Sequence, residues 1–165
     1  MKPSLTEIGR TAQIRMNIFE GKTLWRLTEE QESPVDVKET LKDKVVGLYF
    51  TAKWSPPCQE FMPLLCEVYQ QLIERKLPFE IVHISCDKDQ VEMKETLQKF
   101  RVCWPYLGFA DKHTSDLVEQ FNIIAVPKLI ILSPDGEVIS ETGRKEVADR
   151  GIVCFKFWQC AAKID

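Results

Sequence analysis

The chain has 165 residues, of which 44% are hydrophobic and 28% charged, and its formal net charge at pH 7 is −3. This length and apolar content suit one compact domain with a substantial core. The basic residues are scattered, so nothing indicates a nucleic-acid-binding protein. The apolar runs are too short to span a bilayer, and we expect no membrane segment.

Residues 1–15 contain no apolar core followed by small residues, so no secretory signal is expected. We interpret them as a flexible N-terminal extension and residues 16–165 as a single domain. Six cysteines are enough for three disulfides, but the length of the chain and the lack of a secretory signal favour reduced thiols. The expected location is cytoplasmic, with the nucleus as a further compartment.

Two short elements are predicted before the main fold. Residues 17–28 contain a Gly21-Lys22 turn between two short runs, which indicates an N-terminal β-hairpin. Asp36 followed by Glu39 resembles a capping box and predicts the start of a short helix.

An apolar strand then leads directly into an amphipathic helix. Residues 44–51 are apolar with little alternation, as expected for a central strand covered on both faces. From residue 56 to about 75 the apolar residues recur at helical spacing. Ser55 is a suitable N-cap residue, and Pro56 occupies the favoured first helical position.

The second half of the chain repeats this alternation and ends with a hairpin and a helix. Residues 104–110 are compatible with a loop or a short strand. The other expected elements are strand 79–85, helix 89–100, a helix capped by Thr114 or Ser115 and ending near Phe121, strand 126–132, a turn at 134–136, strand 137–141 and helix 146–162. This order predicts an α/β fold with a mixed central sheet and helices on both of its faces.

The sequence Trp54-Ser55-Pro56-Pro57-Cys58 lies where the strand ends and the helix begins. Backbone N–H groups at a helix start lack intrahelical partners and carry part of the positive macrodipole, so a thiol there ionises more easily than elsewhere. With cysteine at position 55 the motif would be C-x-x-C, a redox signature. The residue at position 55 is serine.

Residues 45–58 resemble the active-site segment of the thioredoxin superfamily, and the pattern of aromatic residues before Cys58 is most similar to its tryparedoxin and nucleoredoxin branch. The similarity extends to the Val126-Pro127 dipeptide before an apolar strand and to the Asp135-Gly136 hairpin. The segment 143–158 is similar to nucleoredoxin-like proteins in particular. The resemblance implies a thioredoxin-like fold.

The resemblance also implies roles for two residues. In the family the first cysteine of the motif attacks a target disulfide and the second resolves the mixed disulfide, so Ser55 takes the nucleophile's position and Cys58 the resolving one. A serine hydroxyl cannot form a disulfide, and we expect a protein-disulfide reductase that is attenuated or inactive. A natural variant and an engineered replacement would both place serine here. The alternative is a non-catalytic binding or signalling module.

Five residues are expected to bind the substrate: Trp54, Pro56, Pro57, Val126 and Pro127. The resemblance implies a cis bond between the last two, and it implies that the Val126 backbone binds an extended chain by strand-like hydrogen bonds. The expected partners are therefore proteins or peptides, either as disulfide substrates or as ligands of this groove. Neither nucleic acid nor a membrane is expected as a partner, and we expect a monomer.

The remaining candidates have simpler interpretations. Cys58 is compatible with a redox thiol or with a half-buried, packed cysteine, and Cys66 is interpreted as a core side chain. Tyr49 stands where ordinary thioredoxins carry a buried aspartate, which leaves no evident base for Cys58. The other cysteines have no C-x-x-C spacing and form no ligand cluster with the two histidines, so no metal site and no cofactor are expected.

Overall fold

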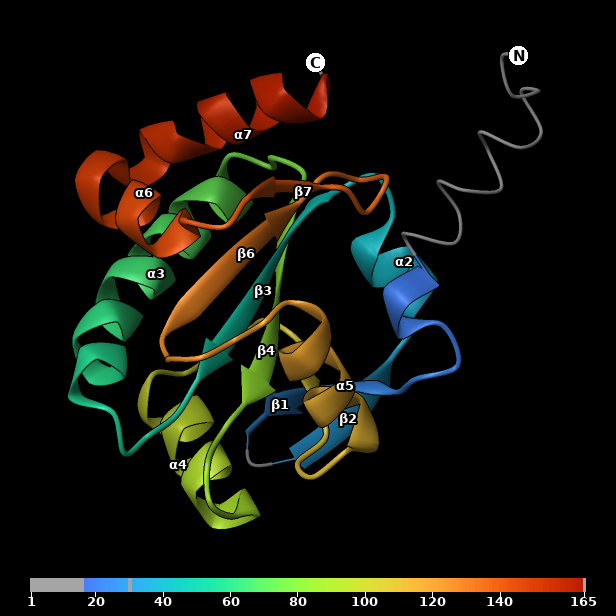
Figure 1. Ribbon diagram of the computed structural model, residues 1–165, viewed down its shortest axis with the longest axis vertical. Coiled ribbons are helices and arrows are strands. Elements are labelled where there is room, and N and C mark those ends of the chain that lie inside the picture. The colour runs from blue at the N-terminus through green and yellow to red at the C-terminus, as the bar shows by residue number, and fades with distance from the viewer. Residues whose placement is uncertain (1–16, 30, 165) are drawn as a thin grey trace.

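The structure is a computed structural model that describes residues 17–29 and 31–164 (Figure 1). The predicted extension, residues 1–15, lies outside the described residues. The elements in chain order are η1 (Asn17–Phe19), β1 (Leu24–Thr28), β2 (Gln31–Val35), α2 (Val37–Leu41), β3 (Val45–Thr51), α3 (Pro56–Glu74), β4 (Phe79–Ser85), α4 (Gln90–Lys99), β5 (Tyr106–Leu107), α5 (Lys112–Gln120), β6 (Lys128–Leu132), β7 (Val138–Ser140), α6 (Gly143–Arg150), η2 (Gly151–Val153) and α7 (Cys154–Ala162).

The described strands form one seven-stranded mixed sheet in the order β2-β1-β5-β4-β3-β6-β7. Strand β3 is parallel to β4 and antiparallel to β6, while β4 is parallel to β5. Antiparallel pairs complete both edges, β1 with β2 and β6 with β7. The predicted α/β fold with a mixed central sheet is confirmed.

Strand β3 is buried along its whole length because both of its faces are covered. Val45 and Tyr49 belong to one apolar cluster, and Leu48 and Phe50 belong to another on the opposite face. Figure 1 shows α3, α6 and α7 on one side of the sheet and α2 and α5 on the other. The apolar block at 44–51 thus forms a central strand, as the lack of alternation predicted.

The N-terminal hairpin exists, but it lies further along the chain than the sequence predicted. Gly21 and Lys22 are not its turn. The Lys22 N–H donates to the carbonyl of Phe19 at 2.9 Å, and Gly21 has φ 73°, so this turn closes η1. The hairpin itself pairs β1 with β2 and closes between Thr28 and Gln31. Phe19, which precedes this turn, is fully buried in the apolar cluster that contains Leu48 and Phe50.

One predicted helix cap is confirmed and another is wrong. The Asp36 carboxylate accepts from the Glu39 N–H at 3.0 Å and caps α2. Helix α5, in contrast, begins one turn before Thr114, because the Asp111 carboxylate accepts from the His113 N–H at 2.8 Å. Aspartate is among the preferred N-cap residues, and Asp111 precedes both predicted caps, Thr114 and Ser115.

The predicted C-terminal helix 146–162 is in fact two helices. Helix α6 ends at Gly151, which has φ 55°, and α7 starts after the short η2 turn. A left-handed backbone is readily adopted by glycine and interrupts the helix there. The chain therefore changes direction between α6 and α7, as Figure 1 shows.

Strand β6 starts two residues later than predicted, at Lys128. Its pairing with β3 ends at the register Phe50 with Lys128, because Pro127 has no N–H to donate to a ladder. In the ambiguous segment 104–110 the structure forms only the short strand β5.

Candidate functional site

The junction between β3 and α3 holds the predicted motif. Ser55 has an extended backbone (φ −96°, ψ 114°) at the N-cap position of α3. Its carbonyl accepts from the N–H groups of Cys58 at 3.0 Å and Gln59 at 3.2 Å. Within the described part of the chain its side chain makes no capping hydrogen bond, so Ser55 has the predicted position but not the predicted hydroxyl cap.

Neighbouring segments fix the loop that leads to this N-cap. The backbone N–H of Lys53 donates to the Asp87 carboxylate at 2.6 Å, and the Gln59 side chain donates to the Lys53 carbonyl at 3.0 Å. The Ser55 N–H also donates to the carbonyl of Ala52. The loop is therefore held to the end of β4 on one side and to the first turn of α3 on the other.

Cys58 lies in the first turn of α3 and is fully buried, with 0% of its surface exposed. The nearby Tyr49 hydroxyl is also buried, and burial is the main reason why the pKa of Tyr49 lies well above its ordinary value. A phenol that stays protonated at neutral pH cannot accept a proton from the thiol. This geometry leaves Cys58 without a base at the Tyr49 position.

Cys86 is a neighbour of Cys58 that sequence reasoning missed. It directly follows β4, and its N–H donates to the Thr51 carbonyl at 2.8 Å, while its carbonyl accepts from the Trp54 indole at 3.3 Å. Burial, the charge of Asp87 and that of Cys58 raise the pKa of Cys86 to about 11. Its position at the carboxyl end of the strand parallel to β3 is the signal that could have identified it.

The predicted substrate-binding residues lie where β3 ends and β6 begins: Trp54 in the loop before α3, Pro56 and Pro57 in the first turn of α3, and Val126 and Pro127 in the loop before β6. Pairing of Phe50 with Lys128 places the residues after β3 beside those before β6. Trp54 is 54% exposed, so its side chain is available on the surface and is not a core residue. Pro56 and Pro57 are exposed.

The loop before β6 supplies the other two predicted residues. Val126 is half-buried and Pro127 buried, and the peptide bond between them is cis. The same loop carries Ile124, whose side chain is 90% exposed. The sequence did not indicate Ile124 as a surface residue, because it belongs to the apolar run 123–126, which is typical of a buried segment.

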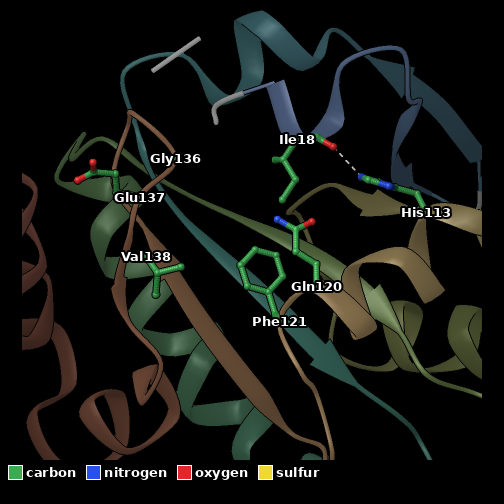
Figure 2. Close-up of a pocket in the computed structure, with 7 residues that line it drawn as sticks. All are labelled: Ile18, His113, Gln120, Phe121, Gly136, Glu137 and Val138. Atoms are coloured by element: carbon green, nitrogen blue, oxygen red, sulfur yellow. Dashed lines mark hydrogen bonds between the residues drawn. The ribbon is translucent and has the colours of Figure 1, made fainter. Parts of the chain in front are cut away.

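A cavity of about 690 Å³ lies elsewhere, between η1, α5 and the turn before β7. Figure 2 shows Ile18, Phe121 and Val138 among its lining side chains. The His113 ring nitrogen Nε2 donates to the Ile18 carbonyl at 2.6 Å across one side of it. None of the lining residues belongs to the motif or to the loop before β6, so this cavity is not part of the candidate site.

Residues 17–29 and 31–164 offer neither a metal site nor a membrane-spanning helix. This part of the chain has no group of three or more His, Cys, Asp or Glu side chains that could hold a metal ion. None of its helices combines the length and the apolar character needed to cross a membrane. All six cysteines are free.

Comparison with known proteins identifies the family. The model of the thioredoxin-like family matches residues 43–138, which is more than half of the chain and includes both loops of the candidate site. The chain belongs to the thioredoxin-like family. This family comprises oxidoreductases that act on protein substrates.

Individual relatives place the chain in the nucleoredoxin and tryparedoxin branch. Nucleoredoxin-like protein 1 from Homo sapiens is 30% identical over 156 residues, which are 90% of this chain and 74% of that protein. Nucleoredoxin from Xenopus laevis is 35% identical over 141 residues, 85% of this chain but only 32% of its own length. The structure of tryparedoxin II from C. fasciculata superposes with a TM-score of 0.71 at 27% identity, over 84% of this chain and 92% of that one. The predicted thioredoxin-like branch is therefore confirmed.

Proposed function

We propose that this chain is a thioredoxin-like thiol-disulfide oxidoreductase whose dithiol turnover is attenuated or absent, because Ser55 holds the position of the attacking cysteine. The observation that carries the proposal is the pairing of an oxygen nucleophile at position 55 with a fully buried sulfur at Cys58. A hydroxyl cannot form a mixed disulfide. A buried thiol cannot be the first group that a folded protein substrate meets.

The partners that fit this site are proteins or peptides in an extended conformation. Trp54, Pro56 and Pro57 are exposed beside the N-terminus of α3, and the Val126 backbone precedes the buried Pro127 at the same edge of the sheet. Main-chain groups next to a strand end bind an extended chain, and flanking apolar side chains add specificity. We infer a monomer that needs no cofactor and acts in the cytoplasm or the nucleus.

Dithiol exchange requires two sulfur atoms. A thiolate at position 55 would attack one sulfur of a substrate disulfide, forming a mixed disulfide and releasing the first substrate thiol. Cys58 would then lose its proton and attack the sulfur at position 55, which releases the second substrate thiol and leaves an intramolecular disulfide. Two electrons pass from the dithiol to the substrate, and Ser55 prevents the first step.

The Ser55→Cys variant tests this proposal. We expect the wild-type chain to add little to the reduction of insulin disulfides by dithiothreitol, and Ser55→Cys to raise that rate by roughly tenfold or more, equivalent to about 1.4 kcal/mol of activation free energy. The matched control is Ser55→Cys combined with Cys58→Ser, which should attack the substrate but retain it as a mixed disulfide. Robust turnover by the wild-type chain would refute the proposal.

A second candidate function is a non-catalytic binding module that uses the same groove. The observation that favours it is the exposure of two apolar side chains in the two loops, Trp54 at 54% and Ile124 at 90%. If binding is the function, partners captured under reducing conditions should survive Cys58→Ala and be lost with Trp54→Ala. Partners that are captured only without reductant, and that Cys58→Ala loses, would instead indicate capture through a mixed disulfide.

A further inference from the structure

A second cavity contains two cysteines that the candidate site does not use. It has a volume of about 350 Å³ and lies between α3 and the segment that joins α4 to β5. Cys66 of α3 and Cys103 of that segment both line it. No residue of the 54–58 motif or of the Val126-Pro127 dipeptide contributes to it.

The two thiols differ in their exposure. Cys103 is exposed and Cys66 is half-buried. Cys66 packs against the apolar cluster, as its core interpretation predicted, but at the edge of that cluster, where it also lines the cavity. Burial and, second, the charge of Cys103 raise the pKa of Cys66 to about 11. At neutral pH Cys66 is therefore a protonated thiol close to a more accessible one.

The backbone that carries Cys103 is firmly anchored. Both of its neighbours, Val102 and Trp104, are buried. The Arg26 guanidinium donates to the Cys103 carbonyl at 2.9 Å and forms an ion pair with the buried Glu80 carboxylate at 3.2 Å. Cys103 is thus an exposed thiol held in place against the cavity.

The charges at the rim of the cavity indicate what kind of ligand it would accept. Glu67 of α3 and Arg101 of the opposite segment both line it. A carboxylate and a guanidinium together can pair with the ammonium and carboxylate groups of a small zwitterionic peptide. The volume suits part of such a peptide and is too small for a folded protein domain.

We propose that Cys66 and Cys103 form a second redox-active dithiol, separate from Cys58, which a low-molecular-weight peptide disulfide oxidises at this cavity. The Cys103 thiolate attacks one sulfur of the small disulfide, whose S–S bond breaks as a mixed disulfide forms, and the released thiolate takes a proton from water. Cys66 then gives its proton to the solvent and attacks the Cys103 sulfur. This step forms the Cys66–Cys103 disulfide and releases the second small thiol, so two electrons have passed from the protein to the peptide disulfide.

Glutathione disulfide is the probe for the test. The full chain is incubated with it, quenched with acid at successive times, and analysed by intact mass and peptide mapping. We expect a glutathione adduct on Cys103 to appear first and then to be replaced by a Cys66–Cys103 disulfide that holds no glutathione. Cys160, which is also exposed, should keep its adduct and is the internal control.

Variants separate the two steps. In Cys66→Ser and Cys66→Ala the Cys103 adduct should persist, and in Cys103→Ser Cys66 should stay unmodified. Circular dichroism checks that each variant is folded, and Cys103→Ser replaces an exposed side chain. Since the pKa of Cys66 is about 11, the second step should accelerate nearly tenfold for each pH unit between about pH 7 and 9. A Cys103 adduct as long-lived in the wild type as in Cys66→Ser, or a disulfide from Cys66 to another cysteine, would overturn the proposal.

Discussion

His83 is a histidine enclosed in the middle of β4. It is fully buried, and the Trp104 indole N–H donates to its Nδ1 atom at 3.3 Å. Because Nδ1 accepts this bond, the neutral ring carries its proton on Nε2. Burial lowers the pKa of His83 from 6.5 to about 3. Between about pH 6.5 and pH 3 the ring therefore stays neutral in the folded protein, while in the unfolded chain it is protonated.

This difference predicts an acid sensitivity that one substitution removes. The folded pKa lies below the unfolded one, so the unfolded state binds the proton first, and the stability linked to His83 is full above about pH 6.5 and falls as the pH drops towards 3. Between pH 7 and 5 we expect the free energy of unfolding to fall by about 2 kcal/mol more in the wild type than in His83→Gln. Glutamine can still accept from Trp104 but does not titrate. Urea unfolding at both pH values measures this, and equal losses in the two proteins would contradict it.

Helix α6 approaches strand β6 through a glycine, and this contact shows how one element fixes another. A Cβ atom added at Gly143 would lie 2.8 Å from the Leu129 carbonyl oxygen and 3.0 Å from the Ile131 side chain. Real Cβ atoms do not approach backbone oxygens so closely, and Gly143 therefore permits the close packing of α6 on the sheet. The sequence did not predict a helix start here.

Gly143→Ala should destabilise the protein by about 1–3 kcal/mol, because either the helix or the strand must shift. Gly108→Ala is the matched control, since its Cβ would lie no closer than 3.5 Å to the Trp25 side chain, an ordinary contact. The two substitutions restrict the unfolded chain equally. Thermal or urea unfolding of both variants measures the difference. A loss in Gly143→Ala no larger than in the control would show that α6 adjusts freely.

At the scale of the molecule, two apolar clusters lie on opposite faces of one sheet. Tyr49 of β3 packs in the cluster that contains Trp104 and Trp158, and Leu48, the adjacent residue, packs in the other. Because one strand contributes to both clusters, neither face can lose its packing without exposing the strand that supports the other. We propose that residues 16–165 form a single cooperative unit.

Leu48→Ala tests this cooperativity. The substitution leaves a cavity in the face that lacks Trp104 and Trp158, and it should cost about 2–5 kcal/mol. Tryptophan fluorescence, to which Trp104 and Trp158 of the opposite face contribute, and circular dichroism should nevertheless shift to the same lower denaturant midpoint. Leu65→Ala, in the tryptophan-containing cluster, is the matched comparison. A fluorescence midpoint that Leu48→Ala leaves unchanged would indicate two separate units.

Local sequence patterns were sufficient to predict the elements that depend on residues close together in the chain. The lack of alternation at 44–51, the helical spacing after Pro56 and the Asp36 cap predicted β3, α3 and α2. They were insufficient where packing selects among similar signals. The turn at Gly21 follows the buried Phe19 and closes η1 instead of a hairpin, and Gly151 divides a helix that apolar spacing alone would continue.

The candidate site divides in the same way. Its family, its position at a helix start and the serine at position 55 can be recognised from the sequence alone. The reason is that the end of the strand, the prolines and Cys58 are adjacent in the chain. The neighbours of Cys58 could not be read in this way, since Cys86 and the loop with Ile124 reach this edge through strand pairing across the sheet. The cavity shared by Cys66 and Cys103 also exists only after α3 packs beside the chain that leaves α4. The sequence determined the chemistry of each side chain, and the tertiary structure decided which of them meet, because such contacts depend on the pairing of strands and the packing of helices distant in the chain.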